Sequence, residues 1–197
     1  MVLTIDIGNT TIGIGGFQGN KLLFIEKISS RRPLSDAGYI EKLNMILNKH
    51  GLSAEAFEGS MISSVVPSVT AVFSSALETF LGRKPLILSH KLDLGYEICT
   101  EFPEKVGCDR LADIAGAISR YSLPFVTIDL GTATTFNVLD ENRRFLGGLI
   151  LPGVGTAHRA LLGKTAQLPK GDIHMPAHTI GANTQECITG GMLLGNA

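Results

Sequence analysis

The sequence lacks several features that would point to particular classes of protein. Its 197 residues contain no apolar run of the roughly 18 to 20 residues that a membrane span needs. The first residues also lack the basic and then apolar layout of a signal peptide. The three cysteines, Cys99, Cys108 and Cys187, are scattered without CxxC spacing, so neither a disulfide framework nor a zinc site is expected. We therefore expect a cytoplasmic protein with free thiols.

An excess of charge of either sign is also missing. Lysine and arginine number 17 against 18 aspartate and glutamate residues, which gives a formal net charge of −1. There is thus no basic field to attract nucleic acid or an acidic membrane surface. With 44% hydrophobic and 18% charged residues, the composition is that of an ordinary globular protein. We expect small molecules or proteins as partners, and neither nucleic acid nor membrane.

Strand and helix signals alternate along the first half of the chain. Apolar periodicity together with proline and glycine at the expected ends defines these segments. After a first strand that ends near residue 17, the predicted strands lie at 21–28, 61–66 and 86–88, and the predicted helices at 36–50, 67–81 and, after a loop over 89–107, at 109–121. The resulting order, β-β-α-β-α-β, predicts the α/β class.

One pattern occurs twice in the chain. The stretch "IDIGNTTIGIGGF" places Asp6, Gly8 and two threonines between two apolar segments, and "FVTIDLGTATTFNVLD" does the same with Asp129 and Gly131. A single group of this kind is common as a turn. Because the whole strand, loop and hairpin unit recurs, we predict an internal duplication with two related lobes, at residues 1–118 and 119–197.

The two loops have the residue types that a nucleoside triphosphate site needs. Glycine lets backbone N–H groups approach phosphates closely, and threonine or asparagine side chains add uncharged donors. An aspartate beside such a loop suits Mg²⁺, which takes one or two carboxylates together with waters and phosphate oxygens. The residues that fit are Asp6, Gly8, Asn9, Thr10 and Thr11 in the first loop and Asp129, Gly131, Thr132 and Thr135 in the second. We expect one loop from each lobe to hold the triphosphate.

This layout resembles the actin, Hsp70 and sugar kinase superfamily. The resemblance implies two duplicated ribonuclease-H-like lobes with mixed sheets, which hold ATP through two such loops. The sequence has neither the GxxxxGKS motif of P-loop proteins nor the GxGxxG motif of Rossmann proteins. Since the superfamily contains kinases, ATPases, phosphatases and filaments, residues outside the loops must decide the function.

Asp109 and Arg110 stand together after Gly107 at the start of a predicted helix. One interpretation is an N-capping aspartate beside a solvated arginine. The other is a carboxylate that accepts the proton of a substrate hydroxyl, beside a guanidinium that binds a substrate carboxylate. Spacing alone leaves both interpretations open, and a substrate that carries a hydroxyl and a carboxylate would suit the second.

Six motifs together resemble one family, type III pantothenate kinase. They are "DIGNT", "VGCDRLAD", "DLGTATTFNVLD", "LGGLILPG", "KTAQLP" and "IGANTQECITGGMLLG", and the similarity runs from Met1 to the last residue. The resemblance implies ATP-dependent phosphorylation of pantothenate to 4′-phosphopantothenate, the entry step of coenzyme A biosynthesis. It also implies a homodimer that uses Mg²⁺ and a monovalent cation, K⁺ or NH₄⁺.

The same resemblance assigns site residues. Asp109 matches the general base and Arg110 the residue that holds the substrate carboxylate, while Gly107, Cys108 and Thr184 complete the pantothenate site. The implied contacts to ATP are Asp6, Ile7, Gly8, Asn9, Thr10, Thr11, Ile12 and Gly13, with Gly131 and Thr132 from the second loop. Asp6 lies close to Mg²⁺, and Asp129 matches the monovalent-cation ligand.

The sequence departs from the family pattern at several positions. Thr100 stands where a tyrosine is usual, Asp113 where an asparagine is expected, Asn137 where an aspartate is expected, and Cys187 where a serine is often found. Members of the family also continue beyond the equivalent of Ala197, so we expect the second lobe to be incomplete and ATP binding by such a chain to be weak. Two alternatives stay open: a non-catalytic relative that binds a partner, and another kinase or hydrolase of the superfamily.

Overall fold

The computed structural model describes residues 1–165, 168–169 and 171–195. They form two compact units, Met1–Ser122 and Leu123–Ala197, each described here by itself. Two residues of the "KTAQLP" motif, Ala166 and Gln167, lie outside the described residues. Within the described part of the chain, no helix is long and apolar enough to cross a membrane.

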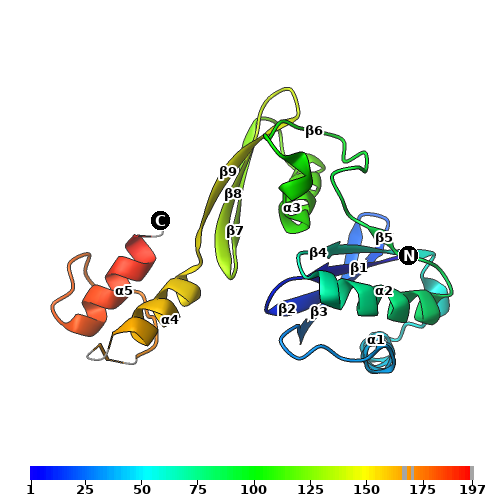
Figure 1. Ribbon diagram of the computed structural model, residues 1–197, viewed down its shortest axis with the longest axis horizontal. Helices are drawn as coiled ribbons and strands as arrows, with labels where there is room; N and C mark the ends of the chain where they lie inside the picture. The colour runs from blue at the N-terminus through cyan, green and yellow to red at the C-terminus, as the bar shows by residue number, and fades with distance from the viewer. Residues whose placement is uncertain (166–167, 170, 196–197) are drawn as a thin grey trace. The chain divides into compact units, whose positions relative to one another are not determined.

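The first unit is built on a five-stranded sheet with the order β3-β2-β1-β4-β5 (Figure 1). The strands are β1 (Val2–Ile7), β2 (Thr11–Gln18), β3 (Lys21–Ser29), β4 (Gly59–Ser64) and β5 (Leu86–Ile87). β1, β2 and β3 are antiparallel, whereas β4 and β5 run parallel to β1, so the sheet is mixed and the predicted α/β class is confirmed. The unit begins with three strands rather than the predicted two, because the Gly8 N–H bonds the Thr11 carbonyl oxygen over 2.9 Å and turns the chain back.

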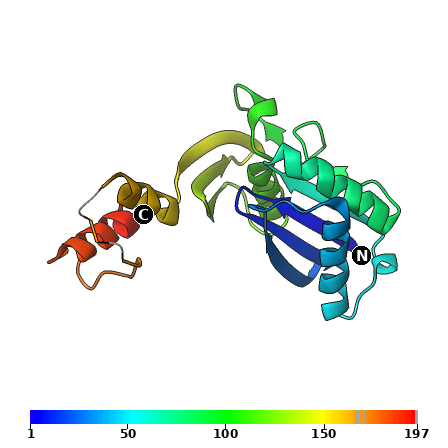
Figure 2. The same cartoon turned by 60° about the horizontal axis from the view of Figure 1, so that its bottom comes forward.

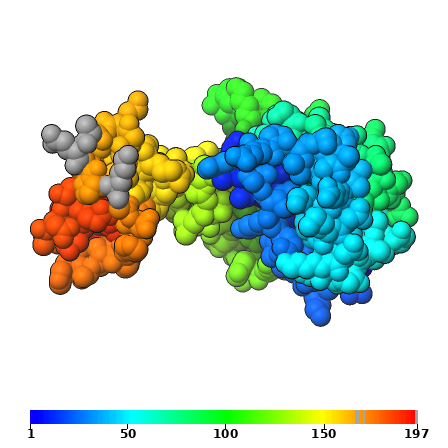
Figure 3. Space-filling model, turned by 90° about the horizontal axis from the view of Figure 1, so that it is seen from below, coloured from blue at the N-terminus to red at the C-terminus, as the bar shows by residue number. Residues whose placement is uncertain are grey.

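Two helices cover one face of this sheet. The helix α1 (Asp36–Lys49) begins after Ser35, whose hydroxyl caps it by accepting the Gly38 N–H over 3.3 Å. The helix α2 (Pro67–Leu81) has proline at its first position and ends before Gly82, where φ is 65°. A short 3₁₀ turn, η1 (Ala54–Ala56), precedes β4. In the view of Figure 3, residues of β1–β3 and α1, in blue and cyan, form much of the visible surface of the first unit.

The core of the first unit lies between the sheet and these helices. Its fully buried side chains include Leu3, Ile5, Ile7, Ile12, Ile14 and Ile62 from the sheet, Tyr39, Leu43 and Leu47 from α1, and Phe73, Ala76 and Leu77 from α2. The rings of Tyr39 and Phe73 meet with centroids 4.5 Å apart. Each leucine, isoleucine or phenylalanine side chain among them contributes about 1.5–3 kcal/mol through its burial.

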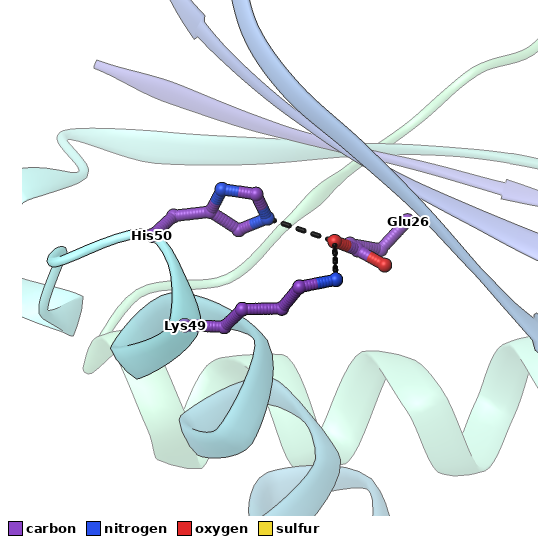
Figure 4. A network of polar contacts seen from close by, with 3 residues as sticks. All are labelled: Glu26, Lys49 and His50. Atoms are coloured by element: carbon purple, nitrogen blue, oxygen red, sulfur yellow. Dashed lines mark hydrogen bonds and ion pairs between the residues drawn. The ribbon is translucent and has the colours of Figure 1, made fainter.

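A polar network ties the end of α1 to β3 (Figure 4). The Oε1 atom of Glu26 accepts from Lys49 Nζ at 2.7 Å and contacts His50 Nε2 at 2.9 Å. The His50 ring also stacks on Phe24, with 4.5 Å between centroids. The network fastens α1 at the edge of the sheet.

The helix α3 (Cys108–Ile118) completes the first unit. It begins one residue earlier and ends three residues earlier than the predicted 109–121. It packs against β4, and Figure 1 shows it on the other side of that strand from α2. Within the predicted loop over 89–107 the structure has β6 (Glu97–Ile98) and η2 (Pro103–Lys105). The Tyr96 hydroxyl fastens this segment to α3 by donating to the Leu111 carbonyl oxygen over 2.9 Å.

The second unit repeats the arrangement of β1–β3. Its strands β7 (Phe125–Leu130), β8 (Ala133–Leu139) and β9 (Arg144–Pro152) are antiparallel neighbours in chain order. The loop between β7 and β8 takes the place of the loop between β1 and β2, as the predicted duplication requires. The helices α4 (Val154–Lys164) and α5 (Thr184–Leu194) follow, in orange and red in Figure 2.

Candidate active site

The carboxyl ends of β1, β4 and β5 lie at one edge of the first sheet, because these strands run parallel. In open α/β sheets, ligands bind outside this edge. Asp6 is the last but one residue of β1, and its strand partner on β4 is Ser63. The loop that begins with Gly8 follows directly, so the predicted phosphate-binding residues lie at the edge where a ligand is expected.

The first loop is held by backbone hydrogen bonds. Besides the bond between Gly8 and Thr11, the Ser30 N–H donates to the Thr10 carbonyl oxygen over 3.1 Å. Of the predicted ATP contacts, Ile7 and Ile12 have fully buried side chains, so they offer only backbone groups to a ligand. Asn9 and Thr11 are exposed and offer side-chain donors.

Gly13 lies opposite Asp6 in the antiparallel pairing of β1 and β2. A Cβ atom at Gly13 would come within 3.8 Å of the Asp6 Cβ. The glycine therefore leaves the surface next to the Asp6 side chain uncovered by a side chain of its own.

The start of α3 is fixed to the carboxyl ends of β4 and β5. The Cys108 thiol donates to the carbonyl oxygen of Leu88, just after β5, over 3.1 Å. Burial raises the pKa of the Cys108 thiol, and the nearby Asp109 carboxylate raises it further. A backbone hydrogen bond from Ser64 lowers this pKa but does not cancel the rise. Gly107 lies against Val65, since a Cβ on this glycine would be 3.7 Å from Val65 Cγ1. Asp109 is thus held next to the end of β4.

Asp109 and Arg110 occupy the first turn of α3. The helix is capped by Gly107, so the interpretation of Asp109 as the N-cap residue is wrong. The Asp109 Oδ1 atom accepts the Arg110 N–H over 2.8 Å, which orients the carboxylate. Arg110 is partly buried rather than solvated, and burial lowers its pKa while the nearby carboxylates of Asp109 and Asp113 raise it.

Three residues next to these positions, Tyr96, Ser63 and Ser64, are not indicated by any of the sequence motifs. Burial raises the pKa of Tyr96, and the Asp113 carboxylate adds to this effect. The only sequence signal for the two serines is that a pair of hydroxyls lies at the end of a buried strand, just as Asp6 lies near the end of β1. No sequence pattern indicated that Tyr96 would reach α3.

The second loop is tied to the start of α4. The Gly131 N–H donates to the Ala133 carbonyl oxygen over 2.9 Å, and the Gly153 N–H donates to the Thr132 carbonyl oxygen over 3.0 Å. A helix amino end has N–H groups without intrahelical acceptors and favours anions. The Asp129 carboxylate lies beside the same loop, because a Cβ at Gly131 would be 3.5 Å from Asp129 Oδ2.

Thr184 is the first residue of α5 in the second unit and is exposed. Its position is set by Asn183, the N-cap residue, whose Oδ1 accepts the Glu186 N–H over 3.0 Å.

Among the departures from the family pattern, Asn137 is fully buried on β8 and donates to Thr127 Oγ1 over 3.0 Å. The hydrogen bond to Thr127 therefore satisfies the neutral Asn137 amide in the interior of this sheet.

A cavity of about 460 Å³ also lies in this unit and is lined by Arg159, Leu162, Gly163, Gly171 and Asp172.

Metal ions differ in how many ligands they need from the protein. Within the described ranges, no group of three or more histidine, cysteine, aspartate and glutamate residues could hold a metal ion by itself. Mg²⁺ in nucleotide sites needs only one or two carboxylates, because waters and phosphates supply its other ligands. The Asp6 carboxylate at the end of β1 fits this requirement, and the exposed Asp129 carboxylate fits a monovalent cation that takes oxygen ligands.

Comparisons with known proteins agree on one family. The sequence profile described as type III pantothenate kinase matches residues 2–197. Curated type III pantothenate kinases from Thermomicrobium roseum and Dictyoglomus turgidum are each 36% identical over the whole of this chain, and this chain covers 76% and 77% of them. The enzyme from Bifidobacterium animalis is 38% identical over 98% of this chain, which covers 76% of that enzyme.

A solved structure shares the fold. The crystal structure of a Baf family protein from Campylobacter jejuni superposes with a TM-score of 0.58 at 17% identity. The match covers 98% of this chain and 75% of that protein. At this identity the similarity concerns the fold and leaves the chemistry to the residues described above.

Proposed function

Because the chain belongs to the type III pantothenate kinase family, we propose that it transfers a phosphoryl group from ATP to pantothenate and forms 4′-phosphopantothenate for coenzyme A biosynthesis. One observation supports the chemistry most strongly. Asp6 pairs with Ser63 of β4, and the residues next to Asp109 contact Ser64 and Val65 at the end of the same strand. A candidate metal carboxylate and a candidate base thus adjoin one strand end within one unit.

The acceptor is bound at the start of α3. Asp109 accepts the proton of the pantothenate hydroxyl as that hydroxyl attacks the phosphoryl group. The Arg110 guanidinium forks onto the pantothenate carboxylate, which aligns the hydroxyl with Asp109. Gly107 leaves room for the Asp109 carboxylate, Cys108 lines the same site, and Thr184 provides a further pantothenate contact.

The phosphates of ATP are held by the two loops. Asp6 holds Mg²⁺, and bound Mg²⁺ neutralises charge on the phosphates. The residues Asp6 to Gly13 bind the phosphates through the exposed donors and backbone of the first loop, and Gly131 and Thr132 bind through the second. Asp129 holds the monovalent cation, which offsets further phosphate charge. These roles are supported by the residue types and their exposure at the two loops.

A homodimer and a cytoplasmic location belong to the same proposal. Exposed apolar side chains such as Ile128, Leu130 and Leu149, which are 56%, 78% and 62% exposed, offer surface for a second copy. The three cysteines are free, as is usual in a reducing compartment.

The test is a coupled assay of ADP release with pantothenate, ATP, Mg²⁺ and K⁺. Substituting Asp109→Asn keeps the shape of the side chain but removes the base, so kcat should fall about 100-fold or more while ATP still binds. The matched control is Glu104→Gln, which neutralises an exposed carboxylate in η2 and should retain activity. The proposal fails if the unmodified protein releases no pantothenate-dependent ADP, or if Asp109→Asn turns over at the same rate.

A further inference from the structure

Ser63 has a buried hydroxyl for which no partner is found among the described residues. The residue is 8% exposed, next to the carboxyl end of β4. Buried polar groups in native proteins are nearly always hydrogen-bonded, because an unmade bond leaves the cost of desolvation uncompensated. A partner supplied by a bound ligand would meet this requirement.

The strand register shows from which face of the sheet the Ser63 side chain projects. Cross-strand partners in a sheet share a face, and neighbouring strands lie about 4.8 Å apart. Ser63 is the partner of Asp6, so both side chains project from the same face. Its neighbours Ile62 and Ser64 project from the other face, where Ile62 joins the core and the Ser64 hydroxyl accepts from Thr70 of α2 over 2.6 Å. The side chains of Ser63 and Asp6 therefore project from the same face of two neighbouring strands.

We propose that Ser63 is a positioning residue for the metal ion held beside Asp6, and that its hydroxyl accepts a hydrogen bond from one of the waters bound to Mg²⁺. Mg²⁺ in nucleotide sites takes one or two carboxylates from the protein and keeps several of its waters. A hydroxyl that projects from the same face on the neighbouring strand would be an acceptor for one of these waters. The hydroxyl then fixes the metal relative to the end of β4, where Asp109 is held. This inference rests on the proposed function, because it takes the metal to be part of an ATP site.

Ser60 provides a control on the same strand. It is also buried, at 6% exposed, and its hydroxyl likewise has no partner among the described residues. Its strand partner is Leu3 of the core, so it projects from the face opposite to Asp6. Ser60→Ala and Ser63→Ala thus remove the same group from the same strand on opposite faces.

The experiment measures Mn²⁺ binding to the protein in the presence of ATP by electron paramagnetic resonance. Ser63→Ala should raise the Kd of Mn²⁺ about tenfold, as expected for loss of a group that orients a metal ligand. Ser60→Ala should leave the Kd at its original value, and Ser63→Thr, which keeps the hydroxyl, should restore it. In the kinase assay, the Mg²⁺ concentration for half-maximal rate should rise for Ser63→Ala with no change in the KM of pantothenate.

The inference is overturned if Ser63→Ala binds Mn²⁺ as the unmodified protein does, if Ser60→Ala weakens binding equally, or if the unmodified protein with ATP binds no Mn²⁺. Its failure is distinguishable from that of the proposed function, because the binding measurement contains no pantothenate. A protein that shows the dependence on Ser63 but does not phosphorylate pantothenate would retain this inference and lose the proposed function.

Discussion

The Gly153 backbone N–H donates to the carbonyl oxygen of Thr132 over 3.0 Å, which joins the start of α4 to the second loop. The same oxygen accepts from Thr156 Oγ1 over 2.8 Å. Two donors on one oxygen hold Thr132, a proposed ATP contact, against a helix amino end. A Cβ atom at Gly153 would collide with the carbonyl oxygen of Gly131 and lie 2.9 Å from that of Thr132.

Gly153→Ala should therefore displace the second loop. Backbone atoms cannot yield as a side chain can, so we expect a loss of about 1–3 kcal/mol in stability together with weaker ATP binding. Thermal unfolding and titration calorimetry with Mg·ATP measure the two effects. Gly191→Ala is the control, since a Cβ there meets nothing within 4 Å and an alanine inside α5 should stabilise by about 0.5–1 kcal/mol. Unchanged ATP affinity in Gly153→Ala would contradict this account.

Asp113→Asn should tighten the binding of pantothenate. The Arg110 guanidinium lies near the carboxylates of both Asp109 and Asp113, and the second of these competes with a substrate carboxylate. Removing that charge should lower the KM of pantothenate about threefold, in line with a partly exposed ion pair of roughly 0.5–1 kcal/mol. Glu78→Gln on α2 removes an exposed carboxylate and should leave the KM unchanged. A KM that rises in Asp113→Asn would show that this carboxylate orients Arg110 for binding.

Cys108 should be the slowest of the three thiols to be alkylated. The thiolate is the reactive form, and burial raises the pKa of Cys108. Cys99 and Cys187 are exposed. Timed treatment with iodoacetamide near neutral pH, followed by peptide mass spectrometry, should show modification of Cys99 and Cys187 first. Early modification of Cys108 would mean that the start of α3 opens readily from β5.

The network around Glu26 should contribute to stability in a manner that depends on pH. Hydrogen bonds from Lys49 and then His50 lower the pKa of Glu26 below its ordinary value of 4.5. A carboxyl group with a lowered folded pKa stabilises above its unfolded pKa, and this stabilisation is lost as the pH falls through the folded pKa. Glu26→Gln should thus lower the Tm at neutral pH and reduce its fall below about pH 4.5.

Tm measured between about pH 3 and pH 7 tests this expectation. The control is Glu41→Gln, an exposed residue of α1, which should keep the acid-dependent fall of the unmodified protein. Burial raises the pKa of Asp140, but hydrogen bonds with Arg144 and Asn142 lower it by more. Part of the acid-dependent fall in Tm should therefore remain in Glu26→Gln as well. Identical profiles for Glu26→Gln and the unmodified protein would contradict the assigned role.

The sequence predicted local features better than element boundaries. The sequence predicts a strand over 61–66, whereas β4 begins at Gly59 and ends at Ser64, because α2 starts at Pro67 after only two more residues. The helix expected at 109–121 begins at Cys108 because Gly107, not Asp109, takes the N-cap position. Both errors lie at the boundary of an element. The periodicity of apolar residues does not show at which residue an element begins or ends.

By itself the sequence determined the α/β class, the repeated strand and loop unit, and the positions of Asp6, Asp109 and Asp129 at element ends. These follow from periodicity and turn chemistry, which act over a few residues. Only the tertiary structure decided that Ser63 pairs with Asp6, that Cys108 bonds Leu88 and that Gly153 bonds Thr132. Such contacts join residues distant in the chain, and they depend on strand register and helix packing, which spacing along the sequence does not encode.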